Sequence, residues 1–88
     1  MKPTIGRTVI YNTTVLEQHM INEHPHNTPQ EQSPAIIVGI KSDSVSLKVF
    51  IDGHGELYVN SAKEGNEQGE WSWPVIETET EEKVKTKA

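Results

Sequence analysis

The stretch that decides the fold is Pro34-Ala35-Ile36-Ile37-Val38-Gly39-Ile40, an almost unbroken apolar run rich in β-branched residues. A short apolar run of this kind predicts a strand that is covered on both faces. After a polar turn at residues 41–44, Val45–Ile51 begins with alternating polarity, which is typical of a strand with one face in a core. The centre of the chain therefore predicts two strands joined by a tight turn.

A second hairpin follows directly. Asp52–Gly55 carries two glycines, which supply the positive φ angles that tight hairpin turns require. Glu56–Asn60 then predicts a fourth strand. Its period of two leaves two orientations open: either Leu57 and Val59 point inward, or Tyr58 does.

The two ends of the chain supply the remaining strands. Thr4–Tyr11 is β-branched and aromatic and predicts a first strand, with a bend or bulge at Gly6. Glu70–Val75 predicts a last strand, after a loop over residues 61–69. Five short strands with hairpin turns and no long helix predict a small all-β barrel, SH3-like in the first instance, with an OB-like roll as the alternative.

A long polar insertion separates the first strand from the second. Asn12–Ser33 contains three of the four histidines, and only Val15–Ile21 within it has the apolar spacing of a short helix. The remainder predicts a long loop, which in a small domain is usually functional or mobile. After the domain, assigned to residues 1–76, residues 77–88 alternate Glu, Thr and Lys and predict a disordered tail.

The composition bounds the function. The chain has 88 residues, no cysteine and a net charge of −5. One domain of this size buries only about 60% of its unfolded surface, so association between subunits would help it. Disulfides and cysteine-based zinc sites are excluded. The acidic balance argues against binding duplex DNA or RNA, and without an apolar leader or span we expect an intracellular protein that does not contact membranes.

Both tryptophans lie in the last predicted strand. Trp71 and Trp73 are two residues apart, so a strand places both indoles on one face. A large buried area favours the core for at least one of them. The alternative is a platform, together with Tyr11 and Tyr58, on which bases stack at about 1–3 kcal/mol per base. The sequence leaves the two interpretations open.

Arg7 is the only arginine of the chain. A surface ion pair is its commonest fate, but its planar guanidinium suits bidentate recognition of phosphate better than any lysine here. If the barrel closes, Arg7 and Tyr11 lie beside the tryptophan segment. Weaker cationic candidates are Lys48 and Lys63, and neutral donors are Thr8, Asn60 and Ser61.

The histidines and acids give little support for catalysis or metal binding. His19, His24 and His26 lie in the polar insertion, where a solvated loop is the expected state, and we predict no metal site. His54 is expected at an exposed turn tip, within reach of a ligand or a neighbouring subunit. The chain lacks a cysteine nucleophile, a Gly-x-Ser-x-Gly elbow and a P-loop, so no enzyme and no cofactor is predicted.

The order of short motifs resembles a small accessory-protein family of tailed phages. The segments that carry the resemblance are Pro3–Tyr11, Pro34–Val38, Val49–Gly53, Tyr58–Ser61, Glu64–Gly65 and Gly69–Pro74. Ser72 stands where that family often has histidine. The resemblance implies a phage protein of the host bacterial cytoplasm. It points to a sponge that sequesters the cyclic nucleotide messenger of a defence system such as CBASS, and such sponges are non-catalytic homo-oligomers.

These observations lead to three functional hypotheses. The first is a non-enzymatic binder of a cyclic dinucleotide or trinucleotide, with a site composed of Arg7, Tyr11, Tyr58, Ser61, Trp71 and Trp73. The second is a virion component or an adaptor for a host protein, in which the tryptophans form the core and residues 12–33 make the contact. The third is a small hydrolase of the same nucleotides.

Overall fold

The computed structural model describes residues 2–75, so the predicted tail over residues 77–88 lies outside the described residues. Six elements are present, namely β1 (Thr8–Asn12), α1 (Val15–Asn22), β2 (Gln32–Ile40), β3 (Val45–Phe50), β4 (Glu56–Ala62) and β5 (Trp71–Ser72). The five predicted strands are confirmed. The first begins later than expected, because Gly6 adopts a φ of 95° in a turn over residues 4–7, and the last is shorter than expected.

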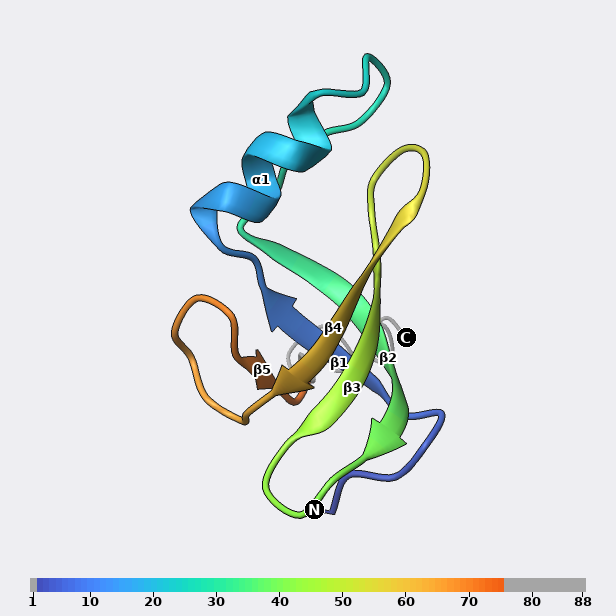
Figure 1. Cartoon of the computed structure of the whole chain (residues 1–88), viewed down its shortest axis with the longest axis vertical. Helices are drawn as coiled ribbons and strands as arrows, with labels where there is room; N and C mark the ends of the chain where they lie inside the picture. The colour runs from blue at the N-terminus through green and yellow to red at the C-terminus, as the bar shows by residue number, and fades with distance from the viewer. Residues whose placement is uncertain (1, 76–88) are drawn as a thin grey trace, which may run out of the picture.

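The strands form one antiparallel sheet in the order β4-β3-β2-β1-β5 (Figure 1). The chain runs as a meander from β1 to β4 and then returns to the free side of β1, where Tyr11 pairs with Trp71. The sheet curls because the segment after β4 also reaches β5: Trp71 N donates to Lys63 O at 3.0 Å, and Gly65 N donates to Trp71 O at 2.8 Å. The result is the predicted small all-β fold, with its long insertion after the first strand.

The core lies on the inner face of the curled sheet. The alternation predicted for β3 is confirmed, because Val45, Leu47 and Val49 are buried. In β4 the orientation left open is resolved, with Leu57 and Val59 packed against the core and Tyr58 outside. The remaining buried members of the cluster are Val9, Tyr11, Ala35, Ile37, Ala62 and Trp71.

One expectation about β2 is wrong. Ala35 and Ile37 are buried, but Val38 and Ile40 are 40% and 47% exposed. Val38 lies on the convex face, which in this antiparallel sheet is open to solvent instead of being covered by helices, whereas Ile40 pairs with the core residue Val45 at the end of the strand. A β-bulge between Ile37 and Gly39 also shifts the register against β3. The continuous apolar run therefore contributes one row to the core and one row to the surface.

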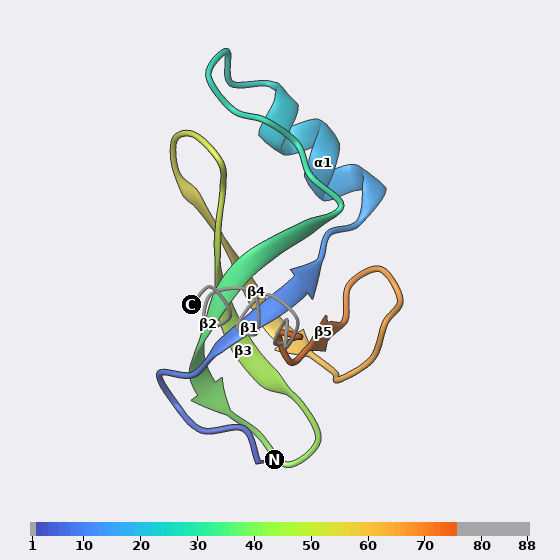
Figure 2. The same ribbon diagram turned by 180° about the vertical axis from the view of Figure 1, so that it is seen from behind.

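The polar insertion is more ordered than a free loop. Thr14 caps α1 in a capping box: Glu17 N donates to its hydroxyl at 3.1 Å, while Thr14 N donates to Glu17 Oε1 at 2.9 Å. At the far end, the insertion meets the tip of the β3–β4 hairpin (Figures 1 and 2), where Thr28 N donates to Asp52 O at 2.9 Å. The insertion is thus held by hydrogen bonds both at the start of α1 and at its tip.

Candidate ligand-binding site beside the β1–β5 pair

The two tryptophans have different environments. Trp71 lies in β5 and is 2% exposed, whereas Trp73 follows the strand and is half-buried against the core. Their rings meet edge to face, with centroids 5.1 Å apart and planes at 85°. This is a favoured aromatic geometry, so Trp71 supports the ring of Trp73 from the side of the core.

Arg7 covers Trp73. It is exposed in the turn before β1, and its guanidinium carbon lies 5.2 Å from the centroid of the Trp73 ring. At this distance the cation is attracted to the π face of the indole. The prediction that barrel closure brings Arg7 and Tyr11 beside the tryptophan segment is confirmed by this contact and by the pairing of Tyr11 with Trp71.

The prediction that Tyr11 and Trp71 stack on a ligand is wrong, because both side chains are buried. Tyr11 and Trp71 are 1% and 2% exposed, so neither presents a ring face to a ligand in this structure. The Tyr11 hydroxyl donates to the Glu17 carboxylate at 3.0 Å. Burial, reinforced by that carboxylate, raises the pKa of the Tyr11 phenol far above its usual range. Of the four aromatics, these two belong to the core.

Trp71 keeps one unusual feature. Its indole Nε1 is buried and has no hydrogen-bond partner among the described residues. The same side chain lines a small cavity of about 150 Å³ beside the turn at residues 41–44. Leaving a buried donor unpaired costs about 1–3 kcal/mol, so the position is not optimised for stability alone.

Tyr58 and Ser61 lie elsewhere. Both are on β4, three strands from β1 in the sheet, and Tyr58 is 59% exposed. The Tyr58 hydroxyl donates to Asn60 Oδ1 at 3.3 Å, and Lys41 Nζ donates to Asn60 Oδ1 and Ser61 Oγ at 2.8 and 3.0 Å. The six predicted residues thus divide into the Arg7–Trp73 pair, the buried Tyr11 and Trp71, and a polar cluster around Lys41.

The weaker cationic candidates face carboxylates. Lys48 Nζ lies 3.3 Å from Glu56 Oε2, and Lys63 Nζ lies 4.0 Å from Asp43 Oδ2. Both pairs are exposed, so they contribute little to stability. They lower the local positive potential around each lysine.

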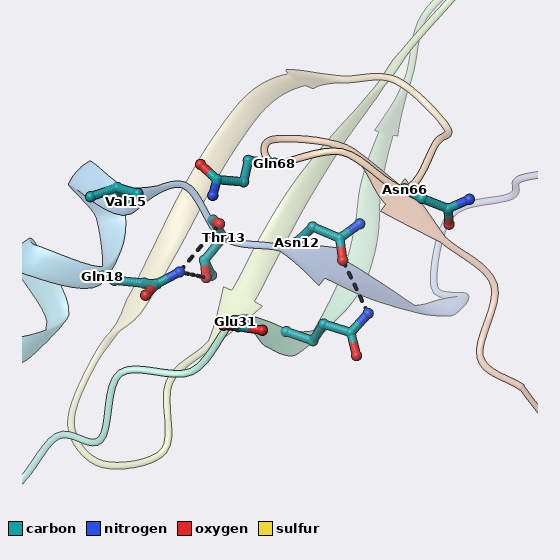
Figure 3. Close-up of a pocket in the computed structure, with 8 residues that line it drawn as sticks. Asn12, Thr13, Val15, Gln18, Glu31, Asn66 and Gln68 are labelled. Atoms are coloured by element: carbon teal, nitrogen blue, oxygen red, sulfur yellow. Dashed lines mark hydrogen bonds between the residues drawn. The ribbon is translucent and has the colours of Figure 1, made fainter.

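Sequence reasoning missed a polar cavity of about 450 Å³ at the opposite end of β1 (Figure 3). Its lining is Asn12, Thr13, Val15, Gln18, Glu31, Gln32, Asn66 and Gln68. Hydrogen bonds between lining residues hold one wall of the cavity in place. Gln18 Nε2 donates to Thr13 Oγ1 at 3.0 Å, and Gln32 Nε2 donates to Asn12 Oδ1 at 3.1 Å. With amides, one carboxylate and no cation in the lining, this cavity suits neutral polar groups and not phosphate.

The amides of this cavity carry no periodic signal. They come from the end of β1, from α1, from the start of β2 and from the loop before β5. Scattered Asn and Gln residues in polar stretches are indistinguishable from ordinary surface residues until the fold places them together.

Three of the four histidines, His24, His26 and His54, form an exposed cluster of rings. His54 lies 4.7 Å from His24 and 5.6 Å from His26 between ring centroids, so it touches the insertion of its own chain. No group of three His, Asp or Glu side chains within residues 2–75 is placed to hold a metal ion. In the same part of the chain, no helix is long and apolar enough to cross a membrane.

The geometry defines a small all-β barrel with an arginine–tryptophan pair at the surface beside its first and last strands. Comparison of the chain with protein-family models, curated proteins and solved structures gives no significant match.

Proposed function

We propose that the protein is a non-enzymatic binder that sequesters a small nucleotide messenger. The observation that carries the proposal is the Arg7 guanidinium, exposed and 5.2 Å above the half-buried Trp73 ring. This pair combines the two kinds of contact by which a protein binds a nucleotide, namely hydrogen bonds to phosphate and stacking on a base. A guanidinium binds phosphate oxygens through a planar fork of donors, and flat guanidinium and indole groups stack on bases.

The residues around the Arg7–Trp73 pair hold the Trp73 ring in place before a ligand binds. Trp71 holds Trp73 edge-on, and Trp71 itself is fixed in the core by β-pairing with Tyr11. A ring that is held before the ligand arrives loses less side-chain entropy on binding. Sequestration works by mass action and requires affinity and abundance, with no chemical step.

The proposed ligand is a cyclic dinucleotide or trinucleotide of host antiphage defence, and the proposed place of action is the host bacterial cytoplasm. Such a ligand carries at least two bases and two phosphates, whereas each chain offers one Arg7–Trp73 pair. The proposal therefore includes a homo-oligomer in which two or more chains contact one ligand.

Calorimetric titration with a panel of cyclic dinucleotides and trinucleotides tests the proposal. We expect one ligand class to release heat, with binding at least tenfold weaker for Trp73→Ala and Arg7→Lys and unchanged for Lys63→Ala, which removes a cation elsewhere. Absence of heat with every nucleotide contradicts the proposal. Ligand recovered intact after heat denaturation separates a binder from the hydrolase hypothesis.

A second candidate function, a virion component or host-protein adaptor, is favoured by the convex face of the sheet. Val38, Phe50 and Tyr58 are each at least 40% exposed there. Several large apolar side chains on one small protein often mark a protein contact. Detection of the protein in purified virions, or a host protein that co-purifies in stoichiometric amount, would support this function.

A further inference from the structure

Strand β4 (Glu56–Ala62) is an edge of the sheet. Its strand pairing is with β3, and the barrel closes through residues 63–65, beyond the end of β4. Every second residue of an edge strand turns its N–H and C=O away from its single neighbour. Natural edges are usually protected by proline, bulges or lysine. β4 has no proline, its only charged residue is Glu56, and its bulge, at residues 60–61 opposite Ser46, leaves Glu56–Val59 as a regular edge. We propose that β4 pairs in antiparallel fashion with β4 of a second copy, about a two-fold axis at Tyr58.

This register follows from the two faces of the strand. An axis at Tyr58 places Tyr58 opposite its own symmetry mate, Glu56 opposite Asn60, and Leu57 opposite Val59. Glu56, Tyr58 and Asn60 share the outer face, and Leu57 and Val59 share the inner face, where both are only partly buried against the core. The pairing therefore extends the apolar inner row across the interface and brings two exposed tyrosines together.

Charge makes the edge complementary to itself. Lys41 Nζ is held on Asn60 Oδ1 at 2.8 Å and on Ser61 Oγ at 3.0 Å. With Asn60 opposite Glu56, the carboxylate of one copy meets the ammonium of the other, and the two-fold axis repeats this contact. Glu56 is also 3.3 Å from Lys48 of its own chain, so its carboxylate would lie between two cations. A foreign strand has no reason to carry this pattern, so a second copy is the occupant that fits.

The contact involves neither Arg7 nor Trp73, so it is tested separately from nucleotide binding. Sedimentation analysis of the full chain across a dilution series gives the mass. We expect a dimer for the wild-type chain, a monomer for Lys41→Glu and for Glu56→Lys, and a restored dimer for the double variant. A wild-type monomer at every concentration overturns the proposal, as does a double variant that stays monomeric while its circular dichroism spectrum matches that of the wild type.

Disulfide trapping tests the register. The chain has no cysteine, so Tyr58→Cys introduces a single thiol that meets its mate on the proposed axis. The matched control Phe50→Cys lies on the same outer face but on β3, opposite Glu56, so its two copies are three strand spacings, about 14 Å, apart. Thiols that far apart cannot be bridged. We expect a covalent dimer as the main oxidised species for Tyr58→Cys and at least tenfold less for Phe50→Cys. Equal yields, or more from Phe50→Cys, overturn the pairing.

Discussion

Replacing Gly53 by alanine should release the polar insertion from the β3–β4 hairpin. Gly53 has a φ of 141°, and a Cβ there would lie 2.7 Å from both Asn27 Cα and His26 O, inside van der Waals contact. The neighbouring Gly55 has a φ of 90°, but a Cβ there meets no atom within 4 Å. Gly55→Ala is therefore a matched control, since both variants place an alanine at a positive φ, where an L-residue is strained, and only Gly53→Ala adds the clash.

The additional cost at Gly53 comes from the hydrogen bonds that hold the two tips together. Asn27 Nδ2 donates to His54 O at 3.1 Å, His54 N donates to Asn27 Oδ1, and Thr28 N donates to Asp52 O at 2.9 Å. At about 0.5–1.5 kcal/mol net for each bond, losing all three costs about 1.5–4.5 kcal/mol. Because the tips are exposed, we expect the loss to appear as local opening and not as unfolding of the barrel.

Native-state hydrogen exchange at the Thr28 amide measures this opening. A cost of 1.5–4.5 kcal/mol corresponds to exchange about tenfold to a thousandfold faster in Gly53→Ala than in Gly55→Ala. The amide of Leu47, in the core strand β3, should respond equally to both variants. Equal exchange at Thr28 in the two variants would refute the steric argument and show that the insertion does not depend on its contact with the hairpin.

Two further predictions concern the aromatics. Trp71→Ala should lower the free energy of unfolding by about 3–5 kcal/mol, less about 1 kcal/mol because its unpaired N–H is also removed. Trp73 is half-buried, so Trp73→Ala should lower it by only about 1–2 kcal/mol. Urea denaturation measures both values, and equal values would mean that both rings belong to the core. Stability should fall as pH rises above about 10, because the unfolded chain loses the Tyr11 proton there while the folded chain, whose pKa is raised, retains it. Tyr11→Phe should flatten that alkaline decline, and an unchanged decline would assign it to other groups.

The strands were predictable because local pattern and tertiary burial agree in them. The period of two in Val45–Ile51 depends only on the alternation of a pleated strand, and the glycines of Asp52–Gly55 mark a turn whatever surrounds it. The two-residue period of a strand does not indicate which of its faces is exposed to solvent. It therefore predicted that Trp71 and Trp73 share a face, but it could not show that Trp71 is in the core and Trp73 is partly exposed.

The apolar run of β2 shows where the sequence pattern predicted too much burial. Continuous apolar character is usual in strands buried on both faces, but Val38 is on the open face of an antiparallel sheet and Ile40 is exposed at the end of its strand. Their exposure depends on which elements cover the sheet, and α1 stands beyond the end of β1 and β2 instead of over the convex face (Figure 2). Strand periodicity contains no information about that placement.

Energetics explain why one chain would be a poor sponge by itself. With Tyr11 and Trp71 in the core, each chain offers one base a stacking contact of about 1–3 kcal/mol, through Trp73 and the guanidinium above it. One charge-assisted bond from Arg7 to phosphate adds about 1.5–3 kcal/mol. The sum of about 6 kcal/mol at most corresponds to a Kd of tens of micromolar. Two chains on one ligand double that limit to about 12 kcal/mol, near a nanomolar Kd, before ordering costs. Efficient sequestration therefore requires that two chains bind one ligand, so a binding ratio of one ligand per chain would contradict the proposed function on energetic grounds, whatever the mass of the free protein.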